Sequence, residues 1–198
     1  MIEALLVFAL AIGLGWPLGR YLAAVMRGEP MRGDRVFGFI ERPLYRLLGT
    51  NAAQGMTWRG YAKAFALSNA MVGGLVWVLF MTQAWLPLNP DAIPNMRWDT
   101  ALHTMVSFLT NTNQQHYSGQ AQLSYLSQMI GIVGLQVVTP MMGLALVVAT
   151  LRALFGGKDH DAHGHAPASG EANVGNYWVD VTRATLRFML PLCLLWTV

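Results

Sequence analysis

The chain has 198 residues, of which 54% are hydrophobic and 12% are charged, against about 25% charged residues in ordinary soluble domains. This composition indicates a membrane protein. The net charge of +3 is modest and no basic stripe is interleaved with aromatic residues, which excludes a nucleic-acid partner. Cys193 is the only cysteine, so neither an intrachain disulfide nor a thiolate metal cluster is expected.

Residues 1–27 hold the first predicted transmembrane helix, an apolar run from residue 4 to residue 26. No basic residue precedes the run, which favours a retained helix over a cleaved signal peptide. The loop at 28–60 follows, and the stretch from Arg27 to Lys63 holds seven basic residues against three acidic ones. The positive-inside rule therefore predicts that this loop is cytoplasmic and that the N-terminus lies outside.

Residues 36–48 of that loop have the pattern of an amphipathic helix. The apolar positions recur at helical spacing, at Phe37, Ile40, Leu44, Leu47 and Leu48. We expect a helix that lies on the membrane surface; the alternative is a docking site for a partner.

A short apolar segment at 99–109 follows the second predicted span, at 61–86, and an outer loop with three prolines. Its periodicity predicts a helix with Asp99 as N-cap. At 1.5 Å per residue, such a helix covers roughly half of a ~30 Å hydrocarbon core. The segment therefore has the outline of a re-entrant pore helix rather than a span.

The loop at 110–115 is polar and uncharged. Its residues are Thr110, Asn111, Thr112, Asn113, Gln114 and Gln115. At membrane depth, such a backbone is tolerated only where protein buries it or where it lines a watery cavity. Neutral oxygens suit a dehydrated monovalent cation, whereas a small divalent ion usually calls for carboxylates. We interpret this loop as an ion filter.

The rest of the chain continues the same pattern. A third span is predicted at 123–154, a linker at 156–177 and the start of a further span at 178–198, which reads as truncated because Val198 is still apolar. His160, His163 and His165 in the linker could bind a transition metal, but histidines in a low-complexity loop usually have no specific ligand. Lys158 after two glycines is followed by Asp159, so it forms no phosphate loop.

Several short motifs resemble one known family. They are Thr110-Asn111-Thr112-Asn113, Tyr117-Ser118-Gly119, Ser124 to Met129, Leu86 to Pro90, Gly175-Asn176-Tyr177-Trp178-Val179-Asp180, and Arg20, Trp58 and Tyr61. In this order and spacing they resemble the first part of the potassium-binding A subunit of the Kdp-type potassium-transporting ATPase. The likeness extends over nearly the whole chain.

The resemblance implies an all-α membrane protein with an extra N-terminal helix, one helix, pore helix, filter loop and helix repeat at 61–155, and the start of a second repeat. It implies potassium binding by the filter residues 110–113, with a vestibule formed by Gln114, Gln115, Tyr117, Ser118 and Gly119. It also implies a bacterial inner-membrane location and a non-catalytic role. ATP hydrolysis then falls to a partner B subunit beside a C subunit, and this chain binds no nucleotide.

Two other functions fit the same sequence. A passive channel or ion-coupled potassium transporter uses similar pore-helix repeats, and it differs from a pump subunit in needing no ATP. A non-conducting membrane scaffold predicts no potassium dependence when Asn111, Thr112 or Asn113 is changed.

Overall fold

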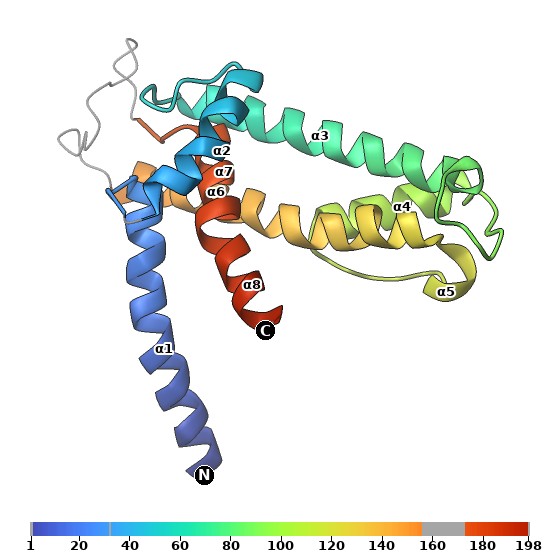
Figure 1. The fold of residues 1–198 in the computed structure, drawn as a ribbon, viewed down its shortest axis with the longest axis horizontal. Coiled ribbons are helices and arrows are strands. Elements are labelled where there is room, and N and C mark those ends of the chain that lie inside the picture. The colour runs from blue at the N-terminus through green and yellow to red at the C-terminus, as the bar shows by residue number, and fades with distance from the viewer. Residues whose placement is uncertain (1, 32, 156–172, 198) are drawn as a thin grey trace. The chain divides into compact units, whose positions relative to one another are not determined.

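The computed structural model describes residues 2–31, 33–155 and 173–197, and within these ranges it contains helices and no strand (Figure 1). The predicted all-α class is confirmed. Three helical stretches in the described ranges are long and apolar enough to cross a membrane. They are α1 (Ile2–Arg27), Trp58–Trp85, which joins α3 (Trp58–Thr82) to a 3₁₀ turn (Gln83–Trp85), and Ser127–Phe155, which joins a π-helical turn (Ser127–Val133) to α6 (Gly134–Phe155).

The chain divides into two compact units. The first comprises Met1–Trp58 and Val147–Val198, and the second comprises Arg59–Leu146. The first unit contains α1, α2 (Asp34–Leu47), the end of α6, α7 (Tyr177–Arg183), a second π-helical turn (Ala184–Met189) and α8 (Leu190–Thr197). The predicted linker histidines His160, His163 and His165 lie outside the described residues.

The core of the second unit forms where α3, α4 (Trp98–Leu109) and α6 meet (Figure 1). Phe80 from α3, Phe108 from α4 and Leu135 from α6 are at most 1% exposed. At Gly73 of α3, an added Cβ would lie 2.9 Å from the sulfur of Met105. The absence of a side chain at that position therefore lets α4 approach α3 closely.

Gln83 joins the loops at one end of this unit. Its side chain is fully buried and donates to the carbonyls of Pro94 and Gln122, both at 2.8 Å, and it accepts from the Ser124 amide at 3.1 Å. A buried amide must be satisfied in this way to be tolerated. Gln83 therefore fixes the connections on both sides of α4.

Arg187 occupies a buried position in the first unit. Its guanidinium bonds the two oxygens of Glu41 at 2.5 and 2.8 Å and one oxygen of Asp34 at 2.6 Å. Asp34 also accepts from the Met31 amide, and this bond, with Arg187 beside it, lowers the pKa of the Asp34 carboxyl. These contacts hold α2 against the helix that carries Arg187, because a buried charge is tolerated only when paired.

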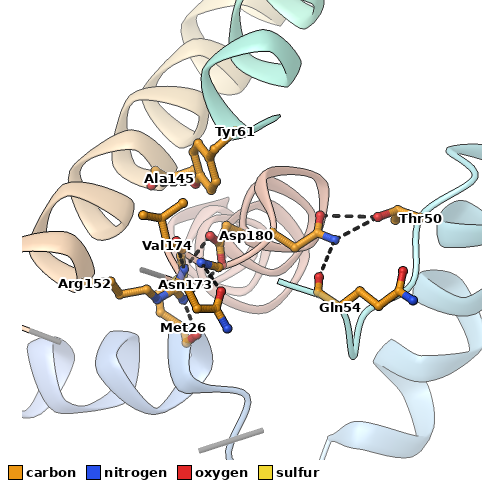
Figure 2. Close-up of polar contacts among 11 residues, drawn as sticks. Met26, Thr50, Gln54, Tyr61, Ala145, Arg152, Asn173, Val174 and Asp180 are labelled. Atoms are coloured by element: carbon orange, nitrogen blue, oxygen red, sulfur yellow. Dashed lines mark hydrogen bonds and ion pairs between the residues drawn. The ribbon is translucent and has the colours of Figure 1, made fainter. Parts of the chain in front are cut away.

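Arg152, near the end of α6, ties three further segments of the first unit together (Figure 2). It forms a bidentate pair with Asp180, at 2.6 and 3.1 Å, and donates to the carbonyls of Val174 and Met26. Gly175 passes directly over this pair with φ +94°, and an added Cβ would lie 2.0 Å from an Arg152 nitrogen. The position therefore requires glycine on both conformational and steric grounds.

We expect Gly131→Ala to destabilise the second unit. Gly131 lies in the first π-helical turn, and an added Cβ would lie 2.5 Å from a ring carbon of the fully buried Phe80. Overpacking of this kind costs about 1–3 kcal/mol, or about 2–10 °C in apparent melting temperature. Thermal unfolding of the full-length protein in detergent measures the shift.

Gly143→Ala is the matched control, because nothing lies within 4 Å of an added Cβ there. Its melting temperature should be unchanged or slightly raised, since alanine favours helix over glycine. Equal losses at both glycines would contradict the packing of Gly131 on Phe80.

Candidate functional site

The candidate site is built on α4. Ala101, Met105 and Phe108 bury one face of this helix in the core of the second unit, and Trp77 donates to the Trp98 carbonyl at 3.2 Å. The predicted N-cap is wrong. The helix begins at Trp98 with Arg97 at the cap position, and Asp99 lies in the first turn, where it accepts from the Thr100 amide.

The loop after α4 folds back onto the end of the helix. Five consecutive amides, at 110–114, donate to groups on Val106, Ser107 and Phe108. The bonds are Thr110 to the Val106 carbonyl at 3.0 Å, Asn111 to that of Phe108 at 3.3 Å, Thr112 and Asn113 to that of Ser107 at 2.9 and 3.1 Å, and Gln114 to the Ser107 hydroxyl at 2.7 Å. The loop therefore satisfies carbonyls that a helix end otherwise leaves without partners.

Ser107 is the centre of this arrangement. Its hydroxyl accepts from the Gln114 amide and donates to the Gln114 carbonyl at 2.9 Å, while its own carbonyl accepts two loop amides. The residue is only 6% exposed. One buried serine therefore closes the loop onto the helix from both ends.

Two asparagines make the turn possible. Asn111 and Asn113 have φ values of +57° and +54°, in the left-handed region that asparagine tolerates better than most residues. The side-chain oxygen of Asn111 also lies 3.0 Å from the hydroxyl of Thr139 on α6. The asparagines are thus explained by backbone geometry, and Asn111 additionally by a contact to the next helix.

The carbonyl oxygens of the predicted filter have a different environment from its amides. Among the described residues, nothing donates a hydrogen bond to the carbonyls of residues 110–113. All four residues are exposed in the structure. The turn therefore presents a run of uncharged backbone oxygens whose amides are already used.

An open hollow of about 410 Å³ lies between this turn and the outer face of α4. The lining residues are Trp98, Asp99, Leu102, His103, Val106, Ser107, Thr110, Thr112 and Gln114. The hydroxyls of Thr110 and Thr112 lie 3.0 Å apart on the loop. Thr110, Thr112 and Gln114, three of the predicted site residues, thus share one surface with α4.

The other predicted vestibule residues lie beyond the turn. Ser118 precedes α5 (Gly119–Gln122), Gly119 is its first residue, and Tyr117 packs against the core. In the described ranges, no hydrogen bond joins them or Gln115 to residues 110–113. A role for these four residues at the loop stays a prediction.

Comparison with known proteins gives a consistent answer. A family model described as "Potassium-transporting ATPase A subunit" (KdpA) matches residues 5–198. The chain belongs to the KdpA family. Curated relatives named potassium-transporting ATPase potassium-binding subunit include those of Desulfovibrio desulfuricans (39% identity over 97% of this chain), Pseudomonas putida (41% over 96%) and Alicyclobacillus acidocaldarius (42% over 95%).

The chain spans about a third of the length of these relatives, covering 31%, 32% and 31% of them. Membership of the KdpA family, whose members are named for potassium transport, confirms the resemblance predicted from the motifs. Together with the span-capable helices, it indicates a membrane protein.

The structure also explains a KdpA-like motif that lies outside the loop. In the motif that begins Gly175-Asn176, Asn176 donates to the Thr50 hydroxyl and to the Gln54 carbonyl (Figure 2). It also donates to the Asn51 carbonyl. Together with the pair between Asp180 and Arg152, these bonds give the motif a structural role within the first unit.

Sequence reasoning missed Ser107 and Thr139. Ser107 carries the one hydroxyl group in the last turn of α4, among apolar residues, and this could have marked it in the sequence as a hydrogen-bonding residue. Thr139 lies 28 positions from Asn111, so only the fold brings it near. Within the described residues, no group of three or more histidine, cysteine, aspartate or glutamate side chains is placed to hold a metal ion.

We expect Ser107→Ala to loosen the loop. The change removes both bonds between the Ser107 hydroxyl and Gln114, each typically contributing about 0.5–1.5 kcal/mol. Amide exchange of the peptide covering 110–115 should become about fivefold faster or more. Hydrogen–deuterium exchange of the full-length protein measures this change.

Thr82→Ala is the control, because the Thr82 hydroxyl bonds the Val78 carbonyl of its own helix. That variant should leave exchange at 110–115 unchanged. If Ser107→Ala also left it unchanged, the Ser107 hydroxyl would not be what holds the loop.

Proposed function

We propose that this chain carries the first potassium-binding loop of a potassium-uptake ATPase, with the carbonyls of residues 110–113 as ligands. The observation that carries the proposal is the arrangement of the loop: the amides of residues 110–114 are bonded to α4, while no described residue donates to the carbonyls of residues 110–113. Potassium is held in proteins by such rings of uncharged oxygens, which replace its hydration shell.

The electrostatics of α4 favour a cation at this point. The C-terminal end of a helix carries partial negative charge, equivalent to roughly half an elementary charge. The loop follows that end directly and contains no charged side chain. A monovalent cation therefore gains attraction without the tight carboxylate ligands that favour divalent ions.

The wider role follows from family membership. Relatives are named as potassium-binding subunits of an ATPase, so we infer that this chain's loop binds external potassium and that the ion then passes to an ATP-hydrolysing B subunit, with a C subunit also bound. We place the protein in the bacterial inner membrane with its N-terminus outside, because the loop between the first two span-capable helices is rich in arginine. No nucleotide binds to this chain on this proposal.

Substitution of Asn113 separates a backbone ligand from a side-chain ligand. Asn113→Gly removes the side-chain amide but permits a φ of +54°, whereas Asn113→Val also removes it and strains the turn. The valine change should raise the half-saturating potassium concentration about 5- to 30-fold, and the glycine change by less than about fivefold. Potassium-stimulated ATPase activity of the complete complex, assembled with the full-length subunit, gives both values.

Ala92→Val is the matched control. Ala92 also has a positive φ, +49°, but it lies in the loop before α4. It should lower thermal stability and leave half-saturation by potassium unchanged. If Asn113→Gly raised the half-saturating potassium concentration as much as Asn113→Val, the side-chain amide would be the ligand. If neither change raised it, the ion would bind elsewhere. Potassium uptake without ATP would favour the channel alternative.

A further inference from the structure

The orientation of α2 about its own axis is fixed by one of its faces. Asp34 and Glu41 both bond Arg187, and the guanidinium carbon of Arg187 lies 5.6 Å from the centre of the Phe37 ring. These three α2 residues are separated by three and four positions, so they share one face of the helix. Glu41 is only 4% exposed, which shows that this face is turned inward in the first unit.

A second face of α2 is apolar and exposed. Phe39 is 82% exposed and Leu47 is 83% exposed, although these side chains are usually buried. The exposed apolar stripe consists of Val36, Phe39, Ile40, Pro43 and Leu47. Its positions recur at helical spacing and fall on the side of the helix away from Arg187.

Three arginines run along one edge of this apolar stripe. Arg35, Arg42 and Arg46 are separated by seven and four positions, and each directly precedes a member of the stripe. All three are exposed, and in the described part of the chain none has a carboxylate within ion-pair distance. The two acids of α2 are both held by Arg187. The exposed side of the helix is therefore purely cationic beside an apolar surface.

The position of α2 in the chain brings this side to a membrane surface. The helix lies in the segment between α1 and the span-capable helix Trp58–Trp85. Both neighbours are long and apolar enough to cross a bilayer, so the segment that connects them must run along one face of it. An amphipathic helix in this setting rests at the level of the lipid headgroups.

We propose that α2 is a binding site for anionic phospholipids. The apolar stripe enters the boundary between headgroups and acyl chains, and Arg35, Arg42 and Arg46 bind the headgroup phosphates. Arginine suits this ligand because its planar fork of donors matches phosphate oxygens in pairs. The contacts of Arg187 hold the helix in the orientation that exposes the apolar stripe and the three arginines together. The site is separate from the potassium loop and does not depend on its function.

A fluorescent probe on the apolar stripe tests the proposal. Phe39→Cys, with Cys193 and every other cysteine of the complex replaced by serine, gives one labelling position for an environment-sensitive dye on the full-length subunit, purified with its associated subunits. The protein is placed in phosphatidylcholine vesicles with and without phosphatidylglycerol. We expect a blue-shifted emission that is quenched by a lipid-borne quencher, stronger with phosphatidylglycerol and weakened by high salt.

The triple change Arg35→Gln, Arg42→Gln and Arg46→Gln should abolish the preference for phosphatidylglycerol. Each basic residue near an anionic surface raises the binding affinity for that surface about fivefold, so three residues raise it on the order of 100-fold. The corresponding triple lysine variant keeps the charge and should retain most of the preference. Arg97→Gln, in the outer loop, should leave it intact. Size-exclusion profiles and melting temperatures show whether each variant is folded.

Two results would overturn the proposal. One is a dye signal that is equal in the wild type and the folded glutamine variant, with or without phosphatidylglycerol. The other is a blue-shifted dye emission that the lipid-borne quencher does not reduce and that does not change with lipid charge. This result would show that a protein partner covers the apolar stripe.

Discussion

The arrangement of the candidate site depends on one exchange of hydrogen bonds at the end of α4. A helix leaves its last carbonyls without partners, and a tight loop leaves its amides without partners. Here the loop amides and the helix-end acceptors satisfy one another, because the amides of residues 110–114 donate to the carbonyls of residues 106–108 and to the Ser107 hydroxyl. Among the described residues, the loop backbone groups left without a hydrogen bond include the carbonyls of residues 110–113. A sequence of neutral residues thus offers unbonded backbone oxygens in an exposed turn without any charged side chain.

The surrounding fold supplies the rigidity that this exchange requires. One face of α4 is packed into the core with Phe80 and Leu135, which leaves the helix little freedom to turn or slide. The buried Gln83 bonds the loops before and after α4, so neither end of the segment is free. Tertiary packing therefore fixes the position of α4 and its flanking loops, while the local bonds between residues 106–108 and 110–114 fix the turn itself.

Much of this could be predicted from the sequence, and the rest could not for identifiable reasons. Long apolar runs and the short run at 99–109 indicate helices because their length and periodicity are local properties. The amphipathic pattern at 36–48 likewise anticipated α2, although the helix begins at Asp34. The role of Asp99 as N-cap was wrong, because the helix starts one residue before it. Partners such as Thr139 for Asn111, or Asp180 for Arg152, lie 28 residues away and only the folded chain brings them together.

The π-helical turn at Ser127–Val133 sets the angular phase of α6. Such a turn inserts an extra residue into a helix, and one residue corresponds to about 100° of rotation. On its N-terminal side, Ser127 bonds Ser124, which Gln83 holds; on its C-terminal side, Thr139 reaches Asn111. If the turn relaxed to α-helical geometry with all its residues retained, every later side chain of α6 would rotate by more than a quarter of a circle relative to Ser124, with the Thr139 hydroxyl directed away from the loop. The wide turn thus matters to the site through its geometry, which sets the angle between the residues on its two sides.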